Sequence, residues 1–89
     1  MKKVYVILTR HALERWRQYK GNDKVDTIKK IVAKRIAGRM KKGLIIDSTN
    51  AAQVQIEDDL WATVQLTFKG WKVVTFHHGE HLKGAKKWI

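Results

Sequence analysis

The chain has 89 residues, of which 19 are Lys or Arg and 8 are Asp or Glu, and it contains no cysteine and no proline. A chain of this length is expected to form one domain. Without cysteine it has no disulfide scaffold, no thiolate zinc site and no cysteine nucleophile. Apolar residues make up 44% of the sequence, so the composition is that of a packed core rather than of a disordered chain.

The positive charge is concentrated in the first half of the chain. Residues 1–43 carry 14 Lys or Arg and 3 acids, residues 44–80 carry 2 Lys and 5 acids, and residues 81–89 add 3 Lys, giving a formal net charge of +11. This asymmetry favours a nucleic acid as the partner, because clustered cations create the field that a polyanion needs. A solubilising basic face, an anionic membrane surface and an acidic protein are the alternatives.

The first residues superficially resemble a secretory signal, because two lysines precede the apolar residues 4–8. This run is five residues long, whereas the apolar part of a signal peptide needs roughly 7–15 residues. No later run approaches the roughly 18 apolar residues of a membrane span. We therefore expect a soluble, cytoplasmic protein that does not bind a membrane.

The chain begins with the pattern of a short strand and a helix. Residues 4–8 are β-branched or aromatic, as in a buried strand. Thr9 offers a hydroxyl cap to a helix that begins near Arg10. Gly21 and the following asparagine end this helix.

A second, longer helix is expected over residues 24–42. Asp23 precedes it as the expected cap, and apolar residues recur on one side at helical spacing. Gly43 follows as the stop signal.

The second half of the chain changes to the alternation of β-strands. Strands are predicted at residues 44–46, 52–57, 60–69 and 71–77. Together with the first half, this predicts an α+β fold: one N-terminal strand, two helices, then a three- to four-stranded antiparallel meander, with the helices packed on one face of the sheet. Residues 1–80 form the single domain, and residues 81–89 form a basic C-terminal tail.

The start of the first helix carries candidate catalytic residues. His11 and Arg15 are one turn apart, so a histidine that transfers a proton would lie beside a guanidinium that stabilises a phosphate. Exposed helix charges are the competing interpretation, since polar pairs at this spacing are common.

Three histidines and a glutamate follow the last strand, in the segment His77-His78-Gly79-Glu80-His81. These residue types ligate zinc, but Gly79 disfavours a helical pair of ligands, and adjacent histidines on a strand point to opposite faces. We therefore expect no metal site and no cofactor. His77 or His78 is instead predicted to act with His11 in proton transfer, the alternative being histidines exposed in a loop.

Basic residues on the two helices are the expected nucleic-acid-binding surface. Cations that neutralise phosphates release counterions and make binding depend on salt. A solubilising helix usually mixes charges of both signs, and the second helix has few acids to match its lysines. The candidate binding residues are Arg10, Arg17, Lys30, Lys34, Lys41 and Lys42.

Trp61 lies on the polar register of its strand. It is predicted either to stack on a base or to pack against a helix or another subunit, and packing is favoured because aromatic residues contribute most to a small core.

The segment Leu8-Thr9-Arg10-His11-Ala12-Leu13-Glu14-Arg15, taken with the order of the elements, resembles the small RelE-like toxins of the barnase/RelE-type ribonuclease superfamily and related short domains of unknown function. The likeness covers residues 4 to about 78 in topology, and His11, Ala12, Glu14 and Arg15 as a motif. It implies two helices on an antiparallel sheet, metal-independent cleavage of RNA, and an acidic antitoxin-like partner. Only His11 and Arg15 are carried over as catalytic residues.

The sequence thus predicts a basic, RNA-directed protein, with RNA favoured over DNA. Its most specific form is a metal-independent endoribonuclease toxin of RelE-like type. The alternatives are a non-catalytic nucleic-acid-binding module and a protein of a mobile element that binds an acidic partner.

Overall fold

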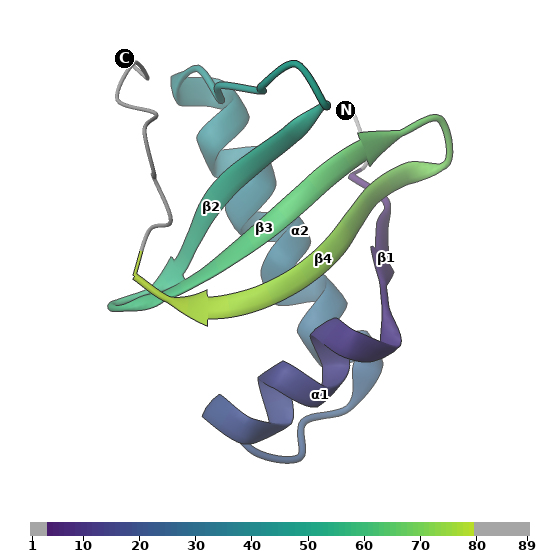
Figure 1. Ribbon diagram of the computed structural model, residues 1–89, viewed down its shortest axis with the longest axis vertical. Helices are drawn as coiled ribbons and strands as arrows, with labels where there is room; N and C mark the ends of the chain where they lie inside the picture. Colours follow the sequence, from purple (N-terminus) through teal and green to yellow (C-terminus); the bar gives the residue numbers. More distant parts are fainter. Residues whose placement is uncertain (1–3, 80–89) are drawn as a thin grey trace.

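The computed structural model describes residues 4–79 as one small α+β unit (Figure 1). Its elements are, in chain order, β1 (Val6–Leu8), α1 (Arg10–Tyr19), α2 (Val25–Lys42), β2 (Ala51–Glu57), β3 (Leu60–Thr67) and β4 (Gly70–His78). The expected α+β class is confirmed. No helix within residues 4–79 is long and apolar enough to cross a membrane. The predicted tail at residues 81–89, and Glu80 and His81 of the histidine-rich segment, lie outside the described residues.

The four strands form one mixed sheet in the order β1-β4-β3-β2. β2, β3 and β4 are antiparallel neighbours, as the alternating pattern predicts, but β1 pairs with β4 in parallel, with Val6 opposite Trp71 and Leu8 opposite Val73. The wholly antiparallel sheet that the resemblance implies is therefore wrong for β1. A parallel pair needs a long crossover between its strands, and α1, α2 and the β2–β3 hairpin all lie in the chain between β1 and β4.

The strand predicted at residues 44–46 is not formed; this segment is a loop between α2 and β2. Its three apolar residues do not alternate into the core, because Ile45 and Ile46 are both more than a third exposed and only Leu44 packs against the core. The loop instead folds back at Asp47, whose backbone N–H donates to the Ala51 carbonyl at 2.9 Å.

Thr9 begins α1 in the way that the sequence indicates. Its hydroxyl oxygen accepts a hydrogen bond from the Ala12 N–H at 3.1 Å, and the hydroxyl donates to the Val73 carbonyl at 2.8 Å. The same side chain therefore caps α1 and fastens the helix to β4.

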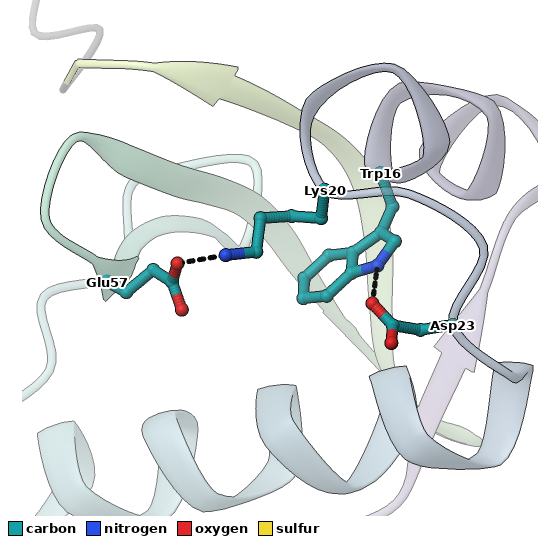
Figure 2. Close-up of polar contacts among 4 residues, drawn as sticks. All are labelled: Trp16, Lys20, Asp23 and Glu57. Atoms are coloured by element: carbon teal, nitrogen blue, oxygen red, sulfur yellow. Dashed lines mark hydrogen bonds and ion pairs between the residues drawn. The ribbon is translucent and has the colours of Figure 1, made fainter.

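The cap predicted for α2 at Asp23 is not formed. Lys24 is the N-cap residue and makes no side-chain cap hydrogen bond. The Asp23 carboxylate instead accepts a hydrogen bond of 2.8 Å from the indole N–H of Trp16 (Figure 2). Trp16 is only 1% exposed, and a buried indole N–H needs a partner. The prediction failed because this tertiary partner binds the carboxylate in place of the helix backbone.

The core lies between α2 and one face of the sheet. Ile28, Val32 and Ile36 of α2 are fully buried, which places the apolar side of the helix against the strands. The sheet contributes alternate residues: Ala52, Val54, Ile56, Leu60, Ala62, Val64, Trp71, Val73 and Phe76. α1 lies across one end of the sheet (Figure 1), where the ring of Trp16 meets Phe76 edge-on with the ring centroids 5.1 Å apart.

Candidate nucleic-acid interface

A hollow lined by cations lies between α2 and β2, the edge strand of the sheet. Its volume is about 290 Å³, and its walls are Lys34, Arg35, Gly38, Arg39 and Lys42 of α2 with Gln55 of β2. The helical period of 3.6 residues places these α2 positions in one stripe beside the buried row. We call this feature the basic hollow.

The four cations of the basic hollow have no carboxylate partner within residues 4–79. In that part of the chain, Glu57 is paired with Lys20, and the Asp59 carboxylate lies 3.5 Å from the ring of His78. The acids of the β2–β3 turn gather around a different hollow, which Tyr19, Lys20 and His78 also line. The acids of the later strands therefore do not neutralise α2, and its charge remains available to a ligand.

Lys20 differs from the cations of α2. Its ammonium group forms a hydrogen-bonded ion pair with Glu57, which joins the end of α1 to the end of β2 (Figure 2). This hydrogen bond raises the pKa of Lys20 above its ordinary value of 10.5. Lys20 is therefore charged but compensated, and it is not part of the candidate interface.

The six binding residues predicted from the sequence are distributed over three places. Lys34 and Lys42 line the basic hollow. Lys30 and Lys41 are exposed elsewhere on α2, and Arg10 and Arg17 are exposed on α1. The structure thus brings two of the six together.

Sequence reasoning missed Arg35, Arg39 and Gln55 as members of the site. The two arginines flank the apolar side of α2 instead of lying opposite to it, so the search for a polar helix face passes over them. This flank of α2 lies beside the edge of the sheet. The sequence could not show this, because the periodicity of a helix does not tell which strand packs beside it.

His11 and Arg15 occupy neighbouring turns of α1. His11 is exposed. Arg15 is half-buried, and its Nη1 donates to Oε1 of Gln18 at 3.4 Å. The two side chains lie one turn apart on α1, as the sequence predicts, and no hydrogen bond joins them.

His77 is built into the sheet and is only 6% exposed. Its Nδ1 lies 2.8 Å from the Gly79 carbonyl, and its Nε2 lies 2.9 Å from the Thr63 hydroxyl. In the neutral ring Nδ1 carries the proton, because a carbonyl only accepts, and Nε2 accepts from Thr63. The Thr63 oxygen in turn accepts from the Gln53 amide at 3.0 Å. Both ring nitrogens of His77 therefore have structural partners.

His78 is exposed at the opposite end of α1 from His11. Its Nδ1 lies 3.5 Å from Oδ2 of Asp59, and its ring centroid lies 4.3 Å from that of Tyr19. Tyr19 ends α1 and His11 is near its start, so the eight intervening steps amount to about 12 Å of helical rise. His11 and His78 are not brought together. Among residues 4–79, no group of three His, Asp or Glu side chains is arranged to hold a metal ion.

Fold and site together define a small α+β protein in which the helix that covers the sheet carries, on one flank, four cations that no carboxylate of residues 4–79 pairs with. Comparisons of the chain with protein-family models, with curated proteins and with solved structures give no match. The likeness to RelE-like toxins therefore stays a prediction from the motif at His11–Arg15.

Proposed function

We propose that this protein binds RNA through α2, with phosphate groups of the RNA seated in the basic hollow. The observation that carries the proposal is the set of four cations, Lys34, Arg35, Arg39 and Lys42, around one hollow of about 290 Å³. None of the four has a carboxylate partner in the described part of the chain.

The chemistry of the hollow suits a phosphate backbone. Arg35 and Arg39 offer planar guanidinium groups that bind phosphate through two parallel hydrogen bonds, while the two lysines add point charges. Gly38 leaves the wall between them open, because nothing lies within 4 Å of the position that a Cβ would take. Each phosphate that is neutralised releases counterions, so binding is strongest at low salt.

Binding is proposed without cleavage. The groups predicted for proton transfer are separated: His11 lies at one end of α1, His78 at the other, and both nitrogens of His77 are bound to neighbours. An acid and a base must both lie within hydrogen-bond reach of the reacting phosphodiester. The choice of RNA over DNA comes from the resemblance to RelE-like toxins, and a DNA duplex is therefore titrated alongside.

The test is a titration of labelled single-stranded RNA, duplex RNA and duplex DNA with the full chain over a range of salt concentrations. We expect the double variant Lys34→Gln/Arg39→Gln to weaken RNA binding and to reduce the slope of log K against log salt by about 1.5, as the loss of two phosphate contacts requires. The matched control is Lys30→Gln/Lys41→Gln, which removes the same charge from the rest of α2 and should reduce the slope less.

Equal effects of the two double variants on RNA binding would contradict the proposed site, because affinity would then depend on the total charge of α2 and not on the cations of the basic hollow. Absence of RNA binding at low salt would contradict the function. Tighter binding of the DNA duplex than of either RNA would replace RNA with DNA as the ligand.

A further inference from the structure

We propose that the free edge of β2 binds an extended acidic peptide segment, which adds to the sheet as a fifth strand and places its acidic side chains in the basic hollow. This second ligand is a protein segment. The proposal goes beyond RNA binding and does not depend on it.

The first observation is that β2 is a long edge strand. It lies at one end of the sheet order β1-β4-β3-β2 and has seven residues, whereas β1, at the opposite edge, has three. Exposed edges are usually shortened, covered, or protected by lysine or proline. The β2 sequence, Ala-Ala-Gln-Val-Gln-Ile-Glu, contains neither lysine nor proline, and its register shift against β3 lies at the last residues, between Gln55 and Glu57.

The register identifies which backbone groups on this edge are free. Leu66 N–H donates to the Asn50 carbonyl at 2.8 Å, so Asn50 and Leu66 form a hydrogen-bonded pair. Antiparallel pairing alternates between hydrogen-bonded and non-hydrogen-bonded pairs. The backbone groups of Ala52 and Val54 therefore form hydrogen bonds with β3. The residues between and beside them direct their N–H and C=O groups away from β3; these are Ala51, Gln53 and Gln55.

At Ala51 the backbone groups on the outer edge of β2 already have partners in the α2–β2 loop. The Ala51 N–H donates to the Asp47 carboxylate at 3.0 Å and its carbonyl accepts from the Asp47 N–H at 2.9 Å. The outward N–H and C=O groups of Gln53 and Gln55 have no such partner within residues 4–79. An added strand can pair with these two residues and is stopped at Ala51 by the α2–β2 loop.

The second observation is the charge beside this edge. Gln55 lines the basic hollow together with the four cations of α2. In an added strand, alternate side chains point to the same side of the sheet. Side chains on the α2 side would meet Lys34, Arg35, Arg39 and Lys42, so acidic residues at every second position are the matching sequence.

The backbone groups also distinguish a peptide from a nucleic acid. The free edge offers N–H donors and C=O acceptors in alternation, and a peptide backbone matches both. Phosphate groups accept but do not donate, so an RNA backbone leaves the carbonyls of Gln53 and Gln55 to its ribose hydroxyls, whereas a peptide backbone pairs with both the N–H and the C=O of these residues. The combination of free edge and cations therefore favours an acidic strand.

The test is a binding titration of the full chain with two labelled peptides of equal composition and charge. In one peptide glutamate alternates with threonine, and in the other the glutamates are consecutive. A third peptide is the alternating one with its backbone amides N-methylated at every second residue, on the edge that faces β2. We expect the alternating peptide to bind roughly tenfold more tightly than either of the others. The peptide with consecutive glutamates places fewer of its charges on the α2 side, and the N-methylated peptide loses backbone hydrogen bonds to β2.

Two protein variants, each with a control, test separately how much the backbone edge of β2 and the cations of α2 contribute to peptide binding. Gln55→Pro removes the outward N–H, which takes no part in the β2–β3 ladder, while Gln55→Ala keeps it and controls for loss of the side chain. Proline should weaken binding of the alternating peptide more than alanine does, because both variants lose the Gln55 side chain that lines the basic hollow and donates to the Asp58 carbonyl, but only proline also loses the N–H. Lys34→Gln/Arg39→Gln should weaken it more than Lys30→Gln/Lys41→Gln.

Equal binding of all three peptides would overturn the proposal, because charge alone would then explain it. Failure of the alternating peptide to bind at low salt would also overturn it. The RNA titration is a separate measurement, so RNA binding can succeed where peptide binding fails, and the reverse.

Discussion

Asp47 holds the loop between α2 and β2 with a single carboxylate oxygen. Its Oδ1 accepts hydrogen bonds from the Thr49 hydroxyl at 2.6 Å, from the Thr49 N–H at 2.8 Å and from the Ala51 N–H at 3.0 Å. The Thr49 hydroxyl, followed by the two backbone N–H groups, lowers the pKa of Asp47 below its ordinary value of 3.8. The loop geometry therefore depends on the ionised form of this side chain.

This dependence predicts a stability difference that varies with pH. Because the pKa of Asp47 is lower in the folded than in the unfolded chain, its contribution is fully present above the unfolded value. It is lost as the pH falls through the folded value. We expect Asp47→Asn to lower the free energy of unfolding at neutral pH, and the difference from the unmodified protein to shrink below pH 3.8. Urea denaturation of the variant and of the unmodified protein over a pH series measures the free energy of unfolding of each, and hence their difference at each pH.

Glu14→Gln is the control for removal of one negative charge, because Glu14 is exposed on α1 and makes no described hydrogen bond. A difference between Asp47→Asn and the unmodified protein that persists unchanged into strong acid would contradict the proposed origin of the effect.

The helices and strands are joined by a few polar side chains at their ends. Thr9 links α1 to β4, Asp23 links the α1–α2 loop to Trp16, and Lys20 links α1 to β2. These contacts fix α1 across the end of the sheet, where Trp16 completes the core. The position of α1 is therefore set by its two ends as well as by its apolar side.

Removal of the Thr9 hydroxyl should destabilise the protein more than an ordinary surface change. Thr9→Ala removes the hydrogen bond to the Ala12 N–H and the one to the Val73 carbonyl, so we expect a loss of about 1–2 kcal/mol in the free energy of unfolding. Thr9→Ser keeps the hydroxyl and should retain most of the stability. Denaturant unfolding checks both variants, and an alanine variant as stable as the serine variant would contradict the double role of Thr9.

Helices and strands are predicted correctly where the apolar residues of a segment follow a single period, either helical spacing or strict alternation. The alternation of Leu60, Ala62 and Val64 with polar residues correctly predicts β3 and its buried side, but the pattern continues into Leu66 and Phe68, which are exposed, and the strand ends at Thr67 instead of residue 69. The apolar row of α2 is confirmed at Ile28, Val32 and Ile36, and the helix ends at Gly43 as expected, whereas Val25 and Met40 at the two ends of the row are exposed. Residues 44–46 fail because a short apolar run has no period that distinguishes a strand from a loop packed on the core.

The molecule as a whole separates its charges along the chain and in space. Four cations that have no carboxylate partner within residues 4–79 gather on α2 beside the β2 edge, whereas the acids of the β2–β3 turn lie near the end of α1 with Lys20 and His78. A polyanion that approaches the α2 side is attracted without competition from these carboxylates. The asymmetry in the sequence thus becomes an asymmetry of the folded surface.

The separation of His11 from His78 predicts that bound RNA stays intact. Because the histidines within residues 4–79 form no paired acid and base, we expect no cleavage products after prolonged incubation with the full chain across the pH range in which histidine titrates. Gel analysis of end-labelled RNA measures this. Cleavage that is present in the unmodified protein and abolished by His11→Ala, with RNA binding retained, would contradict the prediction and restore the ribonuclease hypothesis.

The sequence by itself determined the class of fold, the helix and strand patterns and the concentration of cations in the first half, because periodicity and charge are properties of neighbouring residues. Only the tertiary structure decided that β1 runs parallel to β4 and that the indole N–H of Trp16 donates to the carboxylate of Asp23. It also decided that Arg35 and Arg39 lie at a sheet edge, beside Gln55. The first and the last depend on residues that are distant in the chain, and the second joins residues 16 and 23 across the α1–α2 loop; in all three the meeting is set by how the helices and the sheet pack.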